Sequence, residues 1–250
     1  MQPFRIQLEY RDGQLINIKL QKKINWRLAF VGFFCCFFVL TLFYMFFLTF
    51  AVNDAEMYVH SNIIRLTKMQ EQRFGMAYKE LPIVVIGFPT ELSTTSPGNK
   101  STIHGVFSNN IIYLKKLPVL LPGHTLRNIV LYLLTWGNVY DIEQLLHHEL
   151  VHFYFRNTTF NSLVGEGIAE YIAREMVNNT IILSNWQNVT RTKLVSIVAE
   201  PLYYEIAYAV VKPIVDNHGK TGIIYVLNHP PAENEELLDY QKRMMKEVAR

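Results

Sequence analysis

Hydrophobic positions form one continuous run near the start of the chain and shorter patterns after it. From Leu28 to Val52 no residue is charged, and almost all are apolar. A helix of this length spans roughly 37 Å, enough to cross the ~30 Å hydrocarbon core of a bilayer. The run is also longer than the apolar region of a cleavable signal peptide. It therefore predicts an uncleaved transmembrane helix over residues 28–52.

Short β-branched stretches follow the apolar run at some distance. Ile83–Phe88 lies between two prolines and has the composition of a short buried strand. Two more strands are expected at residues 103–107 and 111–114, joined by a turn at 108–110. The Ser-, Thr-, Pro- and Gly-rich residues 91–102 predict a loop.

Helical spacing dominates the second half of the chain. Residues 126–135 are apolar but too few to cross a bilayer, so they predict a core helix. Asp141 is a suitable N-cap for the next helix, with Gln144 three residues later. The predicted helices are 55–74, 126–135, 141–155, 162–178, 203–217 and 233–249. Strands first and helices afterwards predict an α+β fold for one domain over residues 81–250.

The composition excludes several classes of protein. Half of the residues are hydrophobic and 18% are charged, which excludes a disordered chain. The net charge of +3 is too small to indicate binding to nucleic acid, so none is expected as a partner. The two cysteines, Cys35 and Cys36, are adjacent and lie within the apolar run. This excludes a disulfide framework and a cysteine zinc site in the domain that follows.

Charged residues differ between the two sides of the apolar run. Most charges in residues 1–27 are basic, whereas the first basic residue after the run is Arg65. The positive-inside rule predicts that residues 1–27 are cytoplasmic and that a connector of residues 53–80 and the domain of residues 81–250 lie outside. We therefore expect a single-pass protein of the cell membrane, in contact with lipid through residues 28–52. The absence of cysteine beyond the membrane favours a bacterial one.

The strongest chemical signal is the segment His148-Glu149-Leu150-Val151-His152. Two histidines at positions i and i+4 project from one face of a helix, close enough to bind one Zn²⁺. Glu149 lies between them, where it can take a proton from a water held at the metal. The segment therefore predicts a zinc site with His148 and His152 as ligands and Glu149 as general base.

A second acidic pattern follows on the next predicted helix. A catalytic zinc site needs a third protein ligand, and Glu166 is close enough in sequence to face the histidine pair after a short turn. Glu170, one helical turn later, would hydrogen-bond the free nitrogen of a ligand histidine. Small residues beside them are expected to let this helix approach the HExxH helix closely. They are Gly165, Gly167, Ala169 and Ala173.

Together, HELVH and the later GEGIAEY resemble the gluzincin zinc metallopeptidases of the peptidase MA clan. The resemblance implies a zincin-like domain in which His148, His152 and Glu166 hold Zn²⁺, Glu149 is the base and Glu170 orients a ligand. It also implies that Tyr204 steadies the tetrahedral oxyanion and that the strand pair at residues 104–114 forms the edge above the zinc. From the residues alone Tyr203, Tyr208 and His218 remain alternatives to Tyr204.

These patterns predict a membrane-anchored extracytoplasmic zinc metallopeptidase that acts on a peptide or protein substrate. The segment that grips a free α-amine in the aminopeptidases of this clan has no counterpart in the chain, so that specificity is not carried over. The alternative is a zincin-like surface module without activity that senses or binds a partner in the cell envelope. Zinc content and turnover distinguish the two.

Overall fold

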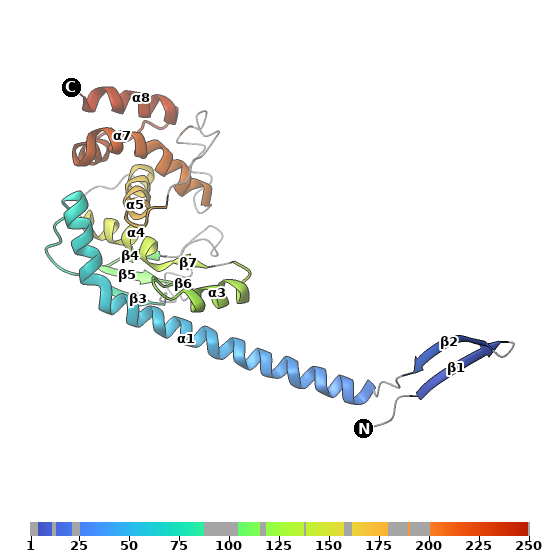
Figure 1. Ribbon diagram of the computed structural model, residues 1–250. Helices are drawn as coiled ribbons and strands as arrows, with labels where there is room; N and C mark the ends of the chain where they lie inside the picture. Colours follow the sequence, from blue (N-terminus) through green and yellow to red (C-terminus); the bar gives the residue numbers. More distant parts are fainter. Residues whose placement is uncertain are drawn as a thin grey trace. The chain divides into compact units, whose positions relative to one another are not determined.

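The computed structural model describes residues 5–11, 14–21, 26–87, 105–115, 119–137, 139–157, 162–179, 190 and 201–249. The chain divides into two compact units, residues 1–48 and 49–250. The predicted α+β class is confirmed, since small sheets are combined with longer helices (Figure 1). The predicted loop at 91–102 and the first two residues of the strand predicted at 103–107 fall outside the described residues.

A two-stranded antiparallel hairpin at the N-terminus was not predicted. It consists of β1 (Arg5–Arg11) and β2 (Gln14–Gln21), in a register that pairs Ile6 with Leu20 and Leu8 with Ile18. Both segments alternate apolar and polar residues, which is the period of a strand. The sequence of residues 1–27, which we expected to be cytoplasmic, therefore already contained the pattern of two strands.

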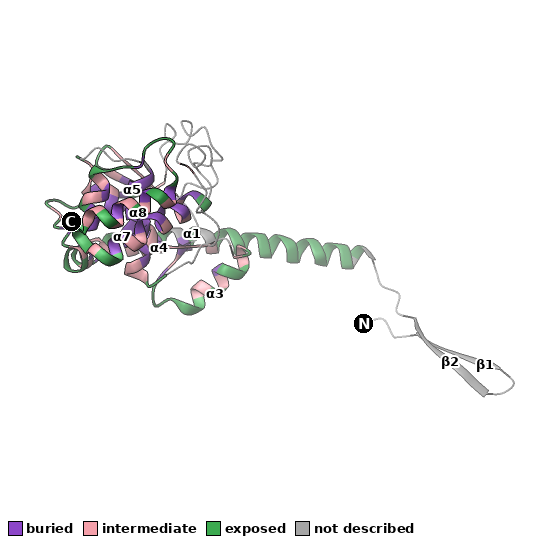
Figure 2. Cartoon of the chain, turned by 90° about the horizontal axis from the view of Figure 1, so that it is seen from above, coloured by how far each residue is buried: buried purple, intermediate pink, exposed green. Residues whose placement is uncertain are grey.

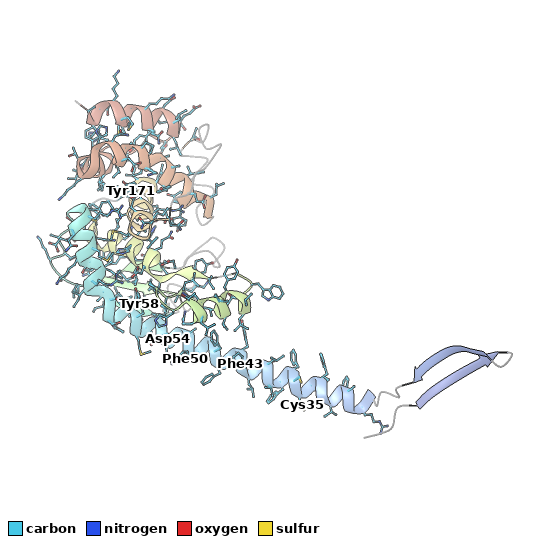
Figure 3. All side chains as sticks on the ribbon, viewed as in Figure 1. Cys35, Phe43, Phe50, Asp54, Tyr58 and Tyr171 are labelled. Carbon is cyan, nitrogen blue, oxygen red and sulfur yellow. The ribbon has the colours of Figure 1, made fainter. Side chains whose placement is uncertain are left out.

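One helix, α1 (Trp26–Phe74), replaces the separate membrane and juxtamembrane helices that we predicted. It is continuous because neither glycine nor proline occurs between Gly32 and Gly75, where φ is positive and the helix has ended. It is long and apolar enough to cross a membrane. Figure 3 shows Cys35, Phe43 and Phe50 projecting from its first half, and these side chains are exposed.

The main sheet has three short strands in the order β3 (Ile83–Ile86), β5 (Ile111–Leu114) and β4 (Gly105–Ser108). β3 is parallel and β4 antiparallel to the central strand β5. The predicted turn is confirmed, since Asn109 and Asn110 connect β4 to β5 with φ of 52° and 63°. Such values suit the two-residue turns of hairpins. Only β4 of the predicted strand pair lies at an edge, which corrects the expectation for residues 111–114.

In the described part of the second unit, five further helices accompany the short parallel pair β6 (Val119–Leu120) and β7 (Tyr140–Asp141). The helices are α3 (Thr125–Leu134), α4 (Ile142–Tyr154), α5 (Ser162–Val177), α7 (Pro201–Asn228) and α8 (Leu237–Val248). Figure 1 shows α4 on the sheet, followed in succession by α5, α7 and α8. α7 continues through Pro213, and its kink lies at Gly219, close to the predicted end of this helix at residue 217.

Two hydrophobic clusters meet at α4. Leu146, Leu150 and Phe153 pack with the sheet and with α1, whereas Val151 belongs to the cluster of α5, α7 and α8. Figure 2 shows this interior in purple. α3 was predicted to be a core helix, but among its residues only Leu131 is buried. The HExxH helix is therefore held between two cores, while α3 lies at the surface.

Gly167 on α5 marks the closest approach between α5 and α7. A Cβ at this position would overlap the carbonyl oxygen of Ala207, so the residue faces α7 and not α4 as we predicted. We expect Gly167→Ala to lower the free energy of unfolding by about 1–3 kcal/mol, since overpacking outweighs the gain in helix propensity. Chemical denaturation in detergent would measure this. Gly32→Ala is the control, because a Cβ there meets nothing within 4 Å, and equal stability of both variants would contradict the packing argument.

Candidate metal centre

The HExxH helix starts at a well-formed cap. The Asp141 carboxylate accepts hydrogen bonds from the backbone N–H of Glu143 (2.8 Å) and of Gln144 (3.1 Å), which confirms the predicted N-cap. The Gln144 side chain does not close a capping box. Its amide donates to Glu170 Oε1 at 3.3 Å instead. The cap therefore also joins the start of α4 to an acidic residue of α5.

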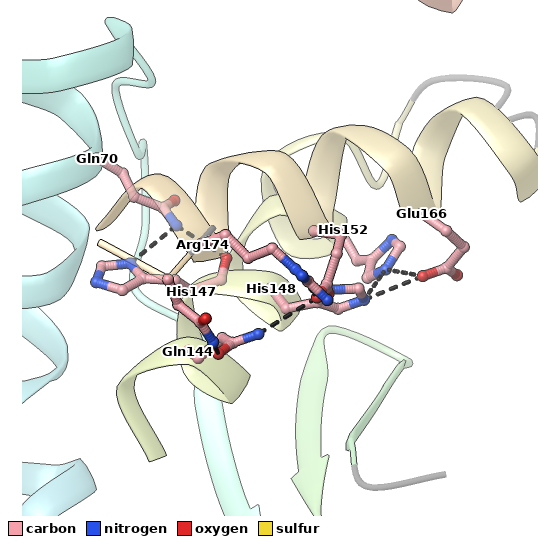
Figure 4. Close-up of polar contacts among 9 residues, drawn as sticks. Gln70, Gln144, His147, His148, His152, Glu166 and Arg174 are labelled. Atoms are coloured by element: carbon pink, nitrogen blue, oxygen red, sulfur yellow. Dashed lines mark hydrogen bonds and ion pairs between the residues drawn. The ribbon is translucent and has the colours of Figure 1, made fainter. Parts of the chain in front are cut away.

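His148, His152 and Glu166 come together as the sequence predicted (Figure 4). His148 Nε2 lies 3.0 Å from Glu166 Oε2 and 3.2 Å from His152 Nε2. His152 Nε2 lies 3.3 Å from the same carboxylate oxygen. Among the described residues, this is the group of three histidine, cysteine or acidic side chains whose ligand atoms converge within 4.8 Å.

The spacing of these three atoms fits a tetrahedral metal ion. Ligands about 2.0–2.1 Å from zinc in a tetrahedron are about 3.3 Å from one another, close to the separations observed. Two imidazole nitrogens and one carboxylate oxygen are also the donor types that zinc prefers. The residues present therefore fit a zinc ion, with His148, His152 and Glu166 as the side chains that would hold it.

Glu170 determines which nitrogen of His148 is free to bind a metal. His148 Nδ1 donates to Glu170 Oε2 at 3.1 Å, so the proton of a neutral imidazole is on Nδ1. The lone pair of Nε2 then points toward Glu166 and His152. This is the contact that the sequence predicted for Glu170.

Arg174 fixes Glu170 in turn, a role that we did not predict. Its Nε donates to Glu170 Oε1 at 2.6 Å, and its guanidinium lies 4.9 Å from the centroid of the Tyr208 ring. Burial opposes ionisation of Glu170, but His148 and Arg174 outweigh it and hold the pKa of this carboxyl below its usual range. The i, i+4 spacing from Glu170 was the signal for Arg174 in the sequence.

In the cluster without metal, the pKa of His148 is raised and the pKa of Glu166 is lowered. Burial lowers the pKa of His148, but its hydrogen bonds to Glu166 and Glu170 outweigh this and raise the pKa well above 6.5. Burial favours the neutral form of Glu166, but the charges and hydrogen bonds of His152 and His148 outweigh it and hold the pKa of Glu166 well below its usual range. At neutral pH the cluster without metal therefore contains an ionised Glu166 and a positively charged His148, which carries a proton on each ring nitrogen.

Glu149 is buried beside this cluster, at 4% exposure. Burial raises the pKa of its carboxyl, as does the charge of Glu166, while His148 and His152 oppose the shift. The backbone of β4 passes directly over it, since a Cβ on Gly105 would overlap the Glu149 carboxylate. Gly105 is thus a site residue that the sequence reasoning missed, because no local pattern connects it to Glu149.

Of the four alternatives for oxyanion stabilisation, Tyr204 lines both cavities together with His148 and Glu149. Its ring is 5.9 Å from the His148 ring, centroid to centroid. Burial, followed by the charges of Glu166 and Glu149, raises the pKa of Tyr204, so its hydroxyl keeps its proton. Tyr203 and Tyr208 belong to the hydrophobic core.

Two cavities share part of their lining at the cluster. The first, of about 390 Å³, is lined by Val106 and Phe107 of β4 and also reaches Glu166. The second, of about 460 Å³, extends toward Tyr140 and Glu205. Both are lined by Gly105, His148, Glu149 and Tyr204.

The neighbouring histidine, His147, belongs to a different network. It is fully buried, and Gln70 of α1 donates to its Nδ1 (3.0 Å) and to its carbonyl oxygen (2.8 Å), as Figure 4 shows. Burial lowers the pKa of His147 to about 4, so the ring is neutral. His147 thus joins α4 to α1 and takes no part in the metal cluster.

Comparisons of the chain with models of protein families, with curated proteins and with solved structures found no significant match. The functional argument therefore depends on the residues of the site and their geometry.

Proposed function

We propose that the chain is a membrane-anchored zinc metallopeptidase whose zincin-like domain, residues 81–250, hydrolyses peptide bonds. The observation that carries the proposal is the convergence of His148, His152 and Glu166 beside the buried carboxylate of Glu149. Donors of this kind and number suit a catalytic zinc site, which leaves a coordination position for water.

Each residue of the site has a role in this reaction. Zinc bound by the three ligands would lower the pKa of water to about 7 and polarise the scissile carbonyl. Glu149 accepts the proton of the attacking water and passes it to the leaving amine. Tyr204, with its hydroxyl protonated, donates a hydrogen bond to the oxyanion. Glu170, held by Arg174, keeps the His148 ring in the orientation required of a ligand.

A polypeptide substrate suits the surroundings of the cluster. Among the described strands β4 lies at the edge of its sheet, so its outer backbone groups can pair with an extended peptide. The two cavities that Glu149 lines provide room for residues before and after the cleaved bond. These two features support peptide hydrolysis over the alternative of a module without activity.

The location of the domain is part of the same proposal. α1 provides the membrane anchor, and the excess of basic residues before the apolar run supports a cytoplasmic N-terminus. The catalytic domain is then extracytoplasmic, at the surface of a bacterial cell.

Metal content tests the proposal directly. The full chain, purified in detergent without added metal, is expected to hold about one zinc ion, whereas His148→Ala and Glu166→Ala should hold none. His60→Ala, on the exposed surface of α1, is the control that should keep its zinc. A folded wild-type chain that binds no added zinc would refute the proposal. Bound zinc without hydrolysis of any peptide in a diverse library would favour the non-enzymatic module.

Zinc binding is expected to release about one proton per site at pH 7, because metal displaces the proton held by His148. The pKa of His148 is raised above 6.5 in the metal-free protein, so the apparent affinity should rise with pH up to that raised pKa. Calorimetric titration in two buffers of different ionisation enthalpy would count the protons. A binding enthalpy that is the same in both buffers at pH 7 would contradict the expectation.

A further inference from the structure

α3 carries its apolar side chains on the outside. Leu126, Ile129 and Leu133 lie on one face of the helix and are 77%, 52% and 68% exposed. On the opposite side Leu131 is buried. A helix at the surface of a water-soluble domain normally has the reverse arrangement, with its apolar stripe toward the core.

The polar residues of α3 are used for attachment to the domain. Arg127 donates to the carbonyl oxygens of Val119 (2.8 Å) and Ala51 (3.0 Å). It also pairs with Asp54 at 3.2 Å. Asn128 exchanges two hydrogen bonds with the backbone of Leu121. The apolar side chains of α3 are consequently the ones left facing outward.

These contacts attach α3 to α1 at the point where the apolar run ends. Ala51 and Asp54 flank the boundary between the uncharged residues 28–52 and the polar part of the helix. Figure 2 shows α3, drawn in green and pink, close to α1. α3 is thus attached to the part of α1 where that helix would leave a bilayer.

Trp136 extends this face beyond the end of α3. It is 96% exposed, and its φ of 55° is in the left-handed region that residues with a side chain rarely adopt. Tyr132, 55% exposed, lies one turn earlier. Tryptophan and tyrosine are enriched where a membrane meets water, since their rings are apolar with a polar edge. The φ of Trp136 belongs to a helix C-cap, in which the N–H groups of Trp136 and Gly137 bond the carbonyl oxygens of Leu133 (3.4 Å) and Tyr132 (2.8 Å).

We propose that the outward face of α3 (Leu126, Ile129, Tyr132, Leu133 and Trp136) lies in the outer interface of the lipid bilayer. At about 15 Å the helix is too short to cross the ~30 Å hydrocarbon core, so its contact is confined to the interface. Arg127 is its one charged residue and is paired with Asp54, so the contact is apolar and does not require anionic lipid. The proposal rests on α1 as the membrane anchor but not on zinc or hydrolysis.

β7 and α4 follow α3 directly, and the cavity at Tyr140 and Asp141 is built from that connection.

Tryptophan fluorescence in lipid nanodiscs containing one full-length chain tests the proposal. With Trp26→Phe and Trp186→Phe, Trp136 is the remaining tryptophan of the chain. We expect its emission to be blue-shifted and to be quenched by phosphatidylcholine brominated near the headgroup, equally with and without phosphatidylglycerol. Adding Leu133→Glu should reduce this quenching, and the thermal unfolding of the variant would show that the fold is kept.

Two further variants lacking Trp136 (Trp136→Phe) make the result decisive. Phe43→Trp reports on α1 within the bilayer, and Ile224→Trp, at an exposed apolar position on α7, reports on a surface of the domain. The proposal is supported if lipid quenches both Trp136 and Phe43→Trp well beyond Ile224→Trp, and it is wrong if Trp136 resembles Ile224→Trp while Phe43→Trp is quenched. Loss of quenching at both Trp136 and Phe43→Trp would overturn it together with the membrane anchor. A blue shift without lipid quenching would show that protein covers the face instead.

Discussion

Glu149→Gln is expected to lower peptide hydrolysis by about 10²–10⁴-fold, the usual contribution of a general base. Glutamine is nearly the same size as glutamate but cannot accept the proton of the attacking water. The zinc content should be unchanged, because Glu149 is not among the three converging ligands. Hydrolysis and metal content would therefore respond differently to this one substitution.

The measurement is the turnover of a peptide found with the wild-type chain, together with the metal content of the same preparation. Glu71→Gln, an exposed position on α1, is the matched control and should keep full activity. Retained turnover in Glu149→Gln would refute the mechanism even if zinc were present. Loss of both zinc and turnover would point to misfolding of the site instead.

Gly105→Ala is expected to cause a loss of hydrolysis comparable to that of Glu149→Gln, although residue 105 has no reactive group. The added Cβ would overlap the Glu149 carboxylate, so either that side chain or the strand β4 must shift. A displacement of about 1 Å at a reacting group can reduce the rate by about 10²-fold. Zinc should remain bound, since the three ligands belong to α4 and α5.

Ser108→Ala in the same strand provides the control for β4 and should leave hydrolysis unchanged. Comparison of the kcat and KM of Gly105→Ala with those of Glu149→Gln would separate a misplaced base from weaker pairing with the substrate. Full activity of Gly105→Ala would contradict the close contact between the backbone of β4 and the Glu149 carboxylate.

The metal cluster could be predicted from the sequence to a large extent, because its geometry is local. The i, i+4 spacing on a helix brings His148 and His152 together whatever the rest of the chain does. A cap at Asp141 is equally local, since the donors lie two and three residues away. Glu166 was within reach because a short connection joins two adjacent helices.

The errors in the predicted fold have a different origin. α3 was assigned to the core from its composition alone, and composition does not state which side of a helix finds a partner. The separation of α1 into two helices followed a change in polarity, yet the backbone responds to glycine and proline and neither occurs there. The hairpin at residues 5–21 was a period-two signal that we did not weigh.

By itself, the sequence determined the apolar helix, the α+β order of elements and the three side chains that converge at the candidate metal site. Each of these follows from spacing within one segment or between neighbouring segments. Only the tertiary structure decided that Gly105 lies over Glu149 and that Gly167 faces α7. Each of these contacts joins two segments that are distant in the sequence. Strand register and helix packing bring them together, and neither can be read from the spacing of residues within one segment.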